Sequence, residues 1–311
     1  MPVPLLAISR TEIDQITLFE LDDPERELAT IPVTGSQPFG LAFDETRRWL
    51  YSACWTSGKI TAIDLSALNE QKSFPASRLP GWATRRDGSS EIWISNEGAD
   101  VITVIDTRTG TVSAQIATGG GPSDIAFTHN GRHAWVTNEK DGNVSVIDAD
   151  TRRNIRNVRV GGVPQGMAVS GGGTQLLVAN FGSNSISVVD TARMEELTQI
   201  AVGRGPVDVV ARGGEPFERA WVTCFSEGAV SVVGLDRNQE IQCIVTGGKP
   251  QGLEIHPNLD RVYVAVRGLN ELVVLSADVP CSILRRIRMD GGPARMAVAA
   301  EPGVHKDIPS R

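Results

Sequence analysis

The sequence predicts an all-β protein, a seven-bladed β-propeller of four-stranded antiparallel blades. Three observations lead to this prediction: prolines recur at nearly constant spacing, each interval holds four short Val- and Ile-rich segments, and no segment shows helical periodicity. The recurring prolines are Pro38, Pro80, Pro122, Pro164, Pro206, Pro250 and Pro293. Their intervals are 42, 42, 42, 42, 44 and 43 residues, a length that suits four strands and their turns.

Within each unit the four segments follow one order. The first strand comes directly after the proline, as in FGLAF or QGMAV, and a polar turn such as THNG ends it. The second reads WLYSAC or HAWVTN and the third KITAID or NVSVID, while the fourth is looser, as in SAQIAT. Gly, Asn and Asp between such runs are typical of antiparallel hairpins. Each unit is therefore expected to fold into one blade.

The two ends of the chain are expected to share a blade. After Pro293 the sequence supplies one strand, ARMAVAA, and the N-terminus supplies three, LLAIS, QITLFELD and ELATIPV. Pairing of these segments closes the ring and removes exposed sheet edges. Residues 1–300 are thus predicted to form a single domain, followed by a polar C-terminal tail at 301–311.

Positions that repeat the same residue type are expected to serve the scaffold. An aspartate ends the third strand in four units, where its carboxylate can accept hydrogen bonds from the next turn. These residues are Asp64, Asp106, Asp148 and Asp190. The Trp and Tyr residues of the second strand are expected to pack between blades.

The second and third strands carry a resemblance to a known family. WVTN at 135–138 and LVAN at 177–180, each followed by VID or VVD, resemble the YVTN-type β-propeller repeat, which would cover nearly the whole chain. The resemblance implies the seven-bladed fold. Similar propellers include surface-layer and binding proteins, lactone-cleaving enzymes, antibiotic-opening lyases and redox-enzyme subunits, so function must be argued from the site.

Composition disfavours two classes of partner. The net charge of -7, from 30 basic and 37 acidic residues, opposes the phosphate backbone of a nucleic acid. No apolar run is long enough to cross a bilayer, and the start, MPVPLLAISR, lacks a basic signal-peptide region. The four cysteines show no metal-ligand spacing and are expected to be free thiols. These features predict a soluble, cytoplasmic protein.

Two positions of the unit vary among polar, charged and aromatic residues, and both are expected at the mouth of the central channel. The residues two places after the prolines are Gly40, Trp82, Asp124, Gly166, Asp208, Gly252 and Arg295. The residues directly after the second strand are Trp55, Glu97, Glu139, Phe181, Phe225 and Arg267, with Arg10 in the shared blade. Further along the inner strand, Glu254 interrupts a series of small residues.

These positions predict a pocket with acids and bases on opposite sides and aromatic walls. The catalytic candidates are Glu97, Glu139, Asp124, Arg267 and Arg295, and the substrate-binding candidates are Arg10, Trp55, Trp82, Phe181, Asp208, Phe225 and Glu254. Neighbouring carboxylates raise one another's pKa, so one of them can stay protonated beside an ionised base. Arginines can bind a carboxylate or a developing oxyanion. Loop charges also occur as a plain solvated rim, but the segregation of sign favours a pocket.

Other chemistries have less support in the sequence. His129, His133 and His256 fall in turns on the opposite face, and His305 lies in the tail, so none is expected as a base at the mouth. No nucleotide-binding fingerprint occurs in the required context, and no cofactor is predicted. A divalent cation such as Ca²⁺ or Mg²⁺ remains an alternative, with Glu97, Asp124, Glu139 and Asn138 as oxygen ligands.

Two functions are compatible with these residues. The first is a small-molecule enzyme that uses acid/base chemistry, of the lyase, hydrolase (lactonase) or cyclase/isomerase kind. Here Glu139 or Glu97 exchanges protons, with positioning by Asp124 and Asp208. The second is a non-catalytic module that binds a protein or peptide through an apolar patch, formed by Trp55, Phe181, Phe225 and Leu269.

Overall fold

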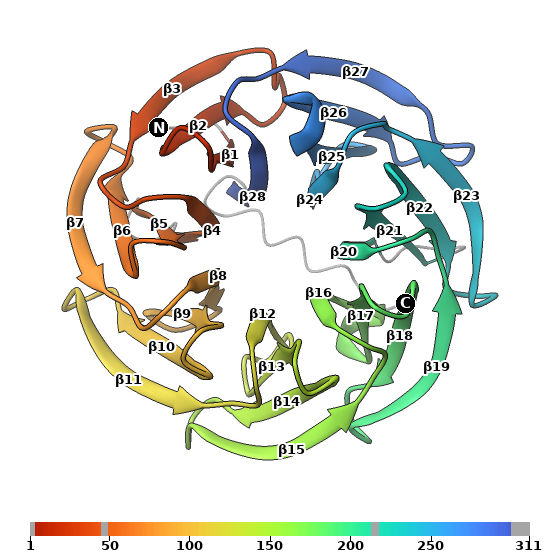
Figure 1. Cartoon of the computed structure of the whole chain (residues 1–311), viewed down its shortest axis with the longest axis horizontal. Coiled ribbons are helices and arrows are strands. Elements are labelled where there is room, and N and C mark those ends of the chain that lie inside the picture. The colour runs from red at the N-terminus through yellow and green to blue at the C-terminus, as the bar shows by residue number, and fades with distance from the viewer. Residues whose placement is uncertain (1–3, 45–48, 213–217, 300–311) are drawn as a thin grey trace.

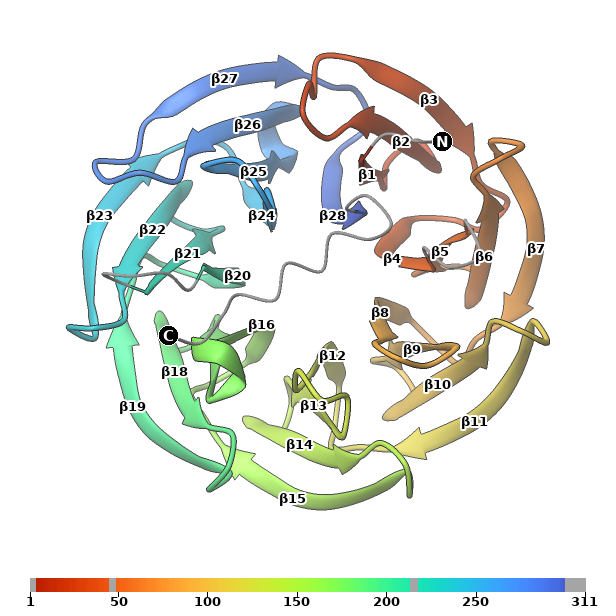
Figure 2. The same cartoon turned by 180° about the vertical axis from the view of Figure 1, so that it is seen from behind.

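The computed structural model describes residues 4–44, 49–212 and 218–299. Seven four-stranded sheets stand around a central axis as the blades of a propeller, with the first strand of each blade innermost (Figure 1). The view from behind shows the same closed ring (Figure 2). The predicted fold class is therefore confirmed. No helix in the described ranges is long and apolar enough to cross a membrane.

The strands of the first four blades have the following bounds. The shared blade comprises β28 (Pro293–Ala299), β1 (Leu5–Arg10), β2 (Gln15–Glu20) and β3 (Glu27–Pro32). The next contains β4 (Pro38–Asp44), β5 (Trp49–Cys54), β6 (Lys59–Asp64) and β7 (Asn69–Pro75). It is followed by β8 (Pro80–Arg86), β9 (Glu91–Asn96), β10 (Val101–Asp106) and β11 (Thr111–Ala117). Then come β12 (Pro122–Phe127), β13 (His133–Asn138), β14 (Asn143–Asp148) and β15 (Arg153–Arg159).

Three blades complete the ring. The first consists of β16 (Pro164–Ser170), β17 (Gln175–Asn180), β18 (Ser185–Asp190) and β19 (Glu195–Ala201). The second consists of β20 (Pro206–Arg212), β21 (Arg219–Cys224), β22 (Ala229–Gly234) and β23 (Gln239–Val245). The third consists of β24 (Pro250–Ile255), β25 (Arg261–Val266), β26 (Glu271–Ser276) and β27 (Ile283–Arg288). Two short 3-10 turns, η1 (Gly171–Gly173) and η2 (Arg267–Leu269), are the helical elements within the described ranges.

Ring closure follows the prediction from the two chain ends. Strand β28 pairs antiparallel with β1, with Leu5 opposite Ala299 and Ala7 opposite Ala297. Since β1 also pairs with β2, the shared blade joins three N-terminal strands to one C-terminal strand. The single domain expected for residues 1–300 stays a prediction, and the predicted tail at 301–311 lies outside the described residues.

The repeated scaffold positions have the roles expected of them. Trp93, Trp135 and Tyr263 on the second strands are fully buried, and Trp93 packs with Ile125 and Val136 of the next blade. At the end of the third strand, Asp106 accepts a hydrogen bond of 2.8 Å from the backbone N–H of Arg108. Asp64, Asp148 and Asp190 each accept the same kind of bond from their own turns. These residues stabilise the blades and the turns.

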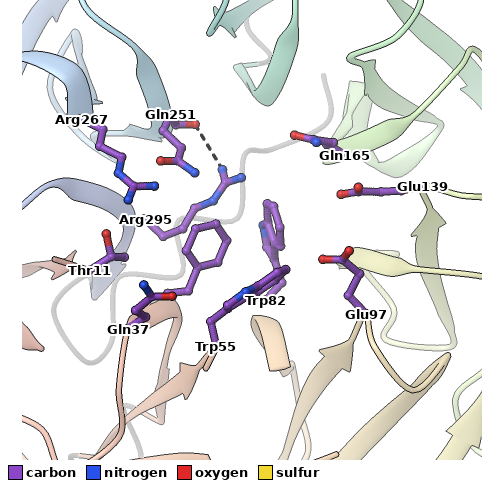
Figure 3. Close-up of a pocket in the computed structure, with 11 residues that line it drawn as sticks. Thr11, Gln37, Trp55, Trp82, Glu97, Glu139, Gln165, Gln251, Arg267 and Arg295 are labelled. Carbon is purple, nitrogen blue, oxygen red and sulfur yellow. Dashed lines mark hydrogen bonds between the residues drawn. The ribbon is translucent and has the colours of Figure 1, made fainter. Parts of the chain in front are cut away.

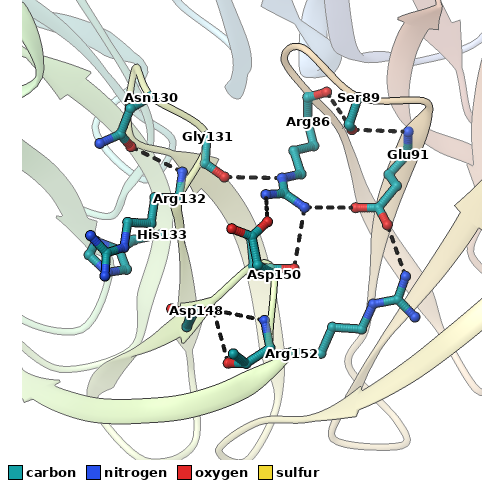
Figure 4. Close-up of polar contacts among 12 residues, drawn as sticks. Arg86, Ser89, Glu91, Asn130, Gly131, Arg132, His133, Asp148, Asp150 and Arg152 are labelled. Atoms are coloured by element: carbon teal, nitrogen blue, oxygen red, sulfur yellow. Dashed lines mark hydrogen bonds and ion pairs between the residues drawn. The ribbon is translucent and has the colours of Figure 1, made fainter.

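Polar contacts tie neighbouring blades together on the face opposite the second-strand ends (Figure 4). Arg86, at the end of β8, donates from Nε to the carbonyl of Gly131 at 3.0 Å and forms an ion pair with Asp150 in the next blade. Glu91 accepts from Arg152 at 2.9 Å and lies 3.4 Å from Arg86. One arginine therefore links the turns of two blades.

Candidate active site

A bulge recurs at the start of the innermost strand in every blade. In β12, Pro122 is opposite Asn138 and Ile125 is opposite Val136, so two residues of the inner strand face one residue of β13. The same shift separates the proline from its strand in the other six blades. A β-bulge redirects side chains, and here the redirected residues surround the channel mouth.

A pocket of about 280 Å³ opens at this mouth (Figure 3). It is lined by Thr11, Gln37, Phe39, Trp55, Trp82, Glu97, Glu139, Gln165, Gln251, Arg267 and Arg295. Trp55, Glu97 and Glu139 directly follow the second strands of three consecutive blades, and Arg267 follows β25. Phe39, Trp82, Gln165, Gln251 and Arg295 come from the bulged starts of inner strands. The loops after the second strands and the bulged starts of the inner strands thus converge on one cavity.

The two carboxyl groups of the pocket have raised pKa values. Burial, together with the neighbouring charge of Glu97, raises the pKa of Glu139 to about 7. The pKa of Glu97 is also raised by burial, while Lys140 opposes the shift. Because the pKa of Glu139 lies near neutrality, this residue can both accept and donate a proton at physiological pH.

Arg295 is held between aromatic rings and an aspartate. Its guanidinium lies 3.8 Å from the centre of the Trp82 ring, and its Nη1 atom lies 2.7 Å from Oδ2 of Asp208. Nη1 also donates to the Gln251 carbonyl at 3.2 Å. Nε is buried and has no hydrogen-bond partner among the described residues. Burial lowers the pKa of Arg295, and Asp208 opposes that shift.

A second cavity of about 210 Å³ lies further along the channel and holds three of the predicted acids. Asp124, Asp208 and Glu254 line it, whereas Trp82 and Arg295 line both cavities and separate them. Asp124 accepts hydrogen bonds of 2.7 Å from the backbone N–H groups of Ile125 and Met167, the latter in the next blade. Asp208 likewise accepts from Leu253 at 3.0 Å. These two carboxyl groups link adjacent inner strands.

Burial dominates the titration of these deeper acids. It raises the pKa of Asp124 to about 7, with a further contribution from the charge of Asp208. Burial raises the pKa of Glu254 to about 8, with Asp208 and Asp124 adding to the shift. The pKa of Asp208 is raised by burial, although Arg295 opposes the change. Of the three carboxyl groups, that of Glu254 is therefore the one that favours the protonated form at neutral pH.

The structure brings six of the twelve predicted site residues into the mouth pocket, namely Trp55, Trp82, Glu97, Glu139, Arg267 and Arg295. Asp124 was expected beside Glu97 and Glu139 but lines the second cavity, as do Asp208 and Glu254. The remaining three line neither cavity. Arg10 bonds to the Asp290 carbonyl at 2.6 Å, the ring of Phe225 lies 5.5 Å from Nζ of Lys249, and Phe181 is half-buried.

Sequence reasoning missed five lining residues: Thr11, Gln37, Phe39, Gln165 and Gln251. Three of them, Phe39, Gln165 and Gln251, come directly after an anchor proline. That position also varies between units, so a comparison of the repeats one residue earlier would have found them. The glycines two places after the proline have a packing role. A Cβ atom at Gly252 would lie 2.3 Å from the Ala294 carbonyl oxygen of the next blade.

The described histidines lie outside the two cavities, and the four predicted cation ligands do not all line the same one. His129, His133 and His256 line neither cavity. Nδ1 of His256 accepts from the backbone N–H groups of Asn258 and Leu259, so its Nε2 donates to Asp22 at 2.8 Å. Of the four predicted cation ligands, Asp124 lies in the second cavity and Asn138 donates to Asn143 and Ser145. Within the described ranges, no group of three or more His, Cys, Asp or Glu is arranged to hold a metal ion.

The fold and the site define a class of protein: a seven-bladed β-propeller with a charged, aromatic-walled pocket at the mouth of its channel. A family model described as a YNCE-like β-propeller matches residues 5–216, about two thirds of the sequence. The chain therefore belongs to the YNCE-like β-propeller family. The YVTN type expected from the repeat stays a prediction. No curated protein matches the chain.

Solved structures of three other proteins share the fold. A putative 6-phosphogluconolactonase from Bacteroides fragilis is 15% identical, with a TM-score of 0.79 and coverage of 96% of this chain and 98% of that one. Hydrazine synthase of Kuenenia stuttgartiensis is 17% identical, with a TM-score of 0.73 and coverage of 83% and 88%. Dihydro-heme d1 dehydrogenase NirN, in complex with DHE, is 15% identical, with a TM-score of 0.71 and coverage of 96% and 75%. At these identities the likeness is one of fold.

Proposed function

We propose that this protein is a small-molecule enzyme that performs acid/base chemistry in the mouth pocket. The observation that carries the proposal is the partly buried pair Glu97 and Glu139, in which burial and mutual repulsion raise the pKa of Glu139 to about 7. A group that titrates near the working pH is an efficient general acid and base. Arg267 and Arg295, on the other side of the pocket, supply positive charge for an anionic group or an oxyanion.

Hydrolysis of a lactone is the reaction that these groups suit best. Ionised Glu139 would take a proton from water as the water oxygen bonds to the lactone carbonyl carbon. The negative charge that develops on the carbonyl oxygen would lie towards Arg295. When the ring C–O bond breaks, Glu139 would return the proton to the departing oxygen and yield a hydroxy acid. The lactonase title of one fold neighbour agrees with this choice, and a lyase or cyclase using the same groups is the nearest alternative.

The proposal also covers the type of propeller and the cellular compartment. We assign the chain to the YVTN type of propeller, on the WVTN and LVAN segments of β13 and β17. We also place it in a reducing, cytoplasmic environment, because its cysteines show no CxxC pair or metal-ligand spacing.

A non-catalytic docking module has less support. That reading predicts an exposed apolar patch made by Trp55, Phe181, Phe225 and Leu269. Of these residues, Leu269 is 44% exposed. The three aromatic side chains are half-buried, and Trp55 faces the pocket. Trp55 is therefore better placed to contact a small ligand than a flat protein surface, and Phe181 and Phe225 line neither cavity.

Proton release from a panel of lactones, compared between the wild type and single variants, tests the proposed function. Glu139→Gln should lower turnover of any accepted lactone by about 10²–10⁴-fold, the usual contribution of a general acid/base. Glu227→Gln is the matched control, because Glu227 also follows a second strand but pairs with Arg204 outside the pocket. Undiminished turnover in the Glu139→Gln variant would rule out this role.

A further inference from the structure

The mouth pocket separates charges of opposite sign across its width. Glu97 and Glu139 come from the adjacent blades β8–β11 and β12–β15 and extend from one side (Figure 3). Arg267 and Arg295 extend from the other side, where blade β24–β27 adjoins the shared blade. A ligand that spans the pocket therefore meets negative charge at one end and positive charge at the other.

Neither side neutralises its own charge completely. Glu97 and Glu139 form no ion pair with any described residue. Arg267 has one exposed ion pair, 3.2 Å from Nε to Glu12. Arg295 uses Nη1 for Asp208 and the Gln251 carbonyl, while its buried Nε has no partner among the described residues. Hydrogen-bonding capacity is left on both sides, and a buried, unpartnered donor is rare unless a ligand or water completes it.

Aromatic rings form the wall between the two charged sides. The ring of Phe39 lies 5.8 Å from that of Trp55 and 5.2 Å from that of Trp82, centre to centre. Such a wall packs against an apolar or cyclic ligand body, and its ring faces attract cations. Gln165 and Gln251 add neutral donors and acceptors at the rim. The pocket thus has three regions in order: acidic, aromatic and basic.

We propose that the mouth pocket binds a zwitterionic small molecule. Its carboxylate or other anionic group would contact Arg267, its ammonium group would contact Glu97, and its body would lie on Trp55 and Trp82, which leaves Glu139 and Arg295 to the proposed reaction. A simple anion would leave the two carboxyl groups unmatched, and a simple cation would leave the arginines unmatched. This inference deepens the proposed function, because it names the substrate class of the same site.

Three probes with one aromatic body separate the contributions of the two charges. They are L-phenylalanine, which carries both charges, 3-phenylpropanoate, which carries the negative one, and 2-phenylethylamine, which carries the positive one. Isothermal titration calorimetry at pH 7.5 should show that L-phenylalanine binds about tenfold or more tightly than either of the others, as expected for one additional charge-assisted hydrogen bond. Equal affinity for either singly charged probe, or no saturable binding of all three, would overturn the proposal.

Two pocket variants test which end of the ligand contacts which side of the pocket. Glu97→Gln should weaken L-phenylalanine and 2-phenylethylamine but not 3-phenylpropanoate, and Arg267→Gln should weaken L-phenylalanine and 3-phenylpropanoate but not 2-phenylethylamine. Glu227→Gln should leave all three affinities unchanged. The reverse assignment, or uniform weakening by both pocket variants, would contradict the orientation. Selective binding without lactone turnover would remove the proposed reaction but leave this inference intact. Turnover without zwitterion selectivity would do the opposite.

Discussion

Replacing Glu254 by glutamine should stabilise the protein at alkaline pH. Glu254 lines the second cavity, and burial with the nearby charges of Asp208 and Asp124 raises its pKa from 4.5 to about 8. Because the pKa is raised in the folded state, the protonated form favours folding. That stabilisation is complete below about pH 4.5 and is lost as the pH rises through about 8. Glutamine stays neutral at every pH and resembles the protonated acid.

The size of the stabilisation at alkaline pH follows from the rise in the pKa of Glu254. A change of about 3.5 pKa units corresponds to about 5 kcal/mol at about 1.4 kcal/mol per unit. Asp124 and Asp208 share the same cavity and take up part of this proton binding, so we expect a gain of about 1–3 kcal/mol at pH 9. At pH 4 the two proteins should differ by less than about 0.5 kcal/mol.

Urea unfolding of the wild type and the Glu254→Gln variant at pH 4, 7 and 9, followed by tryptophan fluorescence, measures this difference. The Glu227→Gln variant is the control: the pKa of Glu227 is lowered by Arg204, so its replacement should give no gain at pH 9. Parallel stability curves for the wild type and Glu254→Gln between pH 4 and pH 9 would refute the reasoning, since they would show that Glu254 has the same pKa in the folded and unfolded states.

Three other substitutions test the scaffold and the site. Arg86→Ala should lower the free energy of unfolding by about 1–3 kcal/mol, because it removes the guanidinium that contacts both Glu91 and the Gly131 carbonyl. Urea unfolding measures this loss, and Arg108→Ala, which replaces an exposed arginine, is the control and should show a smaller loss. Gly252→Ala should destabilise by about 1–3 kcal/mol or more, because its Cβ would meet the Ala294 carbonyl oxygen at 2.3 Å; an unchanged melting temperature would contradict the close approach of these blades. Glu97→Gln should lower the pKa of Glu139, since it removes a repelling charge, and an unchanged or higher pKa in a carboxyl titration would show that the two groups do not interact.

The sequence was sufficient to predict the fold because its seven repeat units can be aligned with one another. Seven prolines at near-constant intervals set the blade boundaries, and hydrophobic alternation set the strands. Closure followed from counting the segments at the two ends, since one strand after Pro293 and three at the N-terminus make one blade. Such local patterns require no knowledge of long-range side-chain packing.

The sequence predicted the site only in part, because the repeat fixes the place of residues in the loops after the second strands but not that of residues on the inner strands. Residues after the second strand, such as Glu97 and Glu139, reach the mouth through short loops of fixed place in the repeat. On the inner strand, the bulge after each proline decides which residue reaches the mouth. Gln165 and Gln251 reach it one residue after the proline, whereas Asp124 lies in the second cavity. Sequence alternation carries no signal for that bulge.

Glu139 is the proton-exchanging group of the proposed reaction, and a pKa of about 7 allows it that role. Difference infrared spectroscopy of the carboxyl stretch, titrated in the wild type and in the Glu139→Gln variant, reports its protonation directly. We predict a carboxyl signal with a midpoint near pH 7 that disappears in the variant. A midpoint near the ordinary value of 4.5 would contradict the account, because Glu139 would then be fully ionised at neutral pH and could not act as an acid.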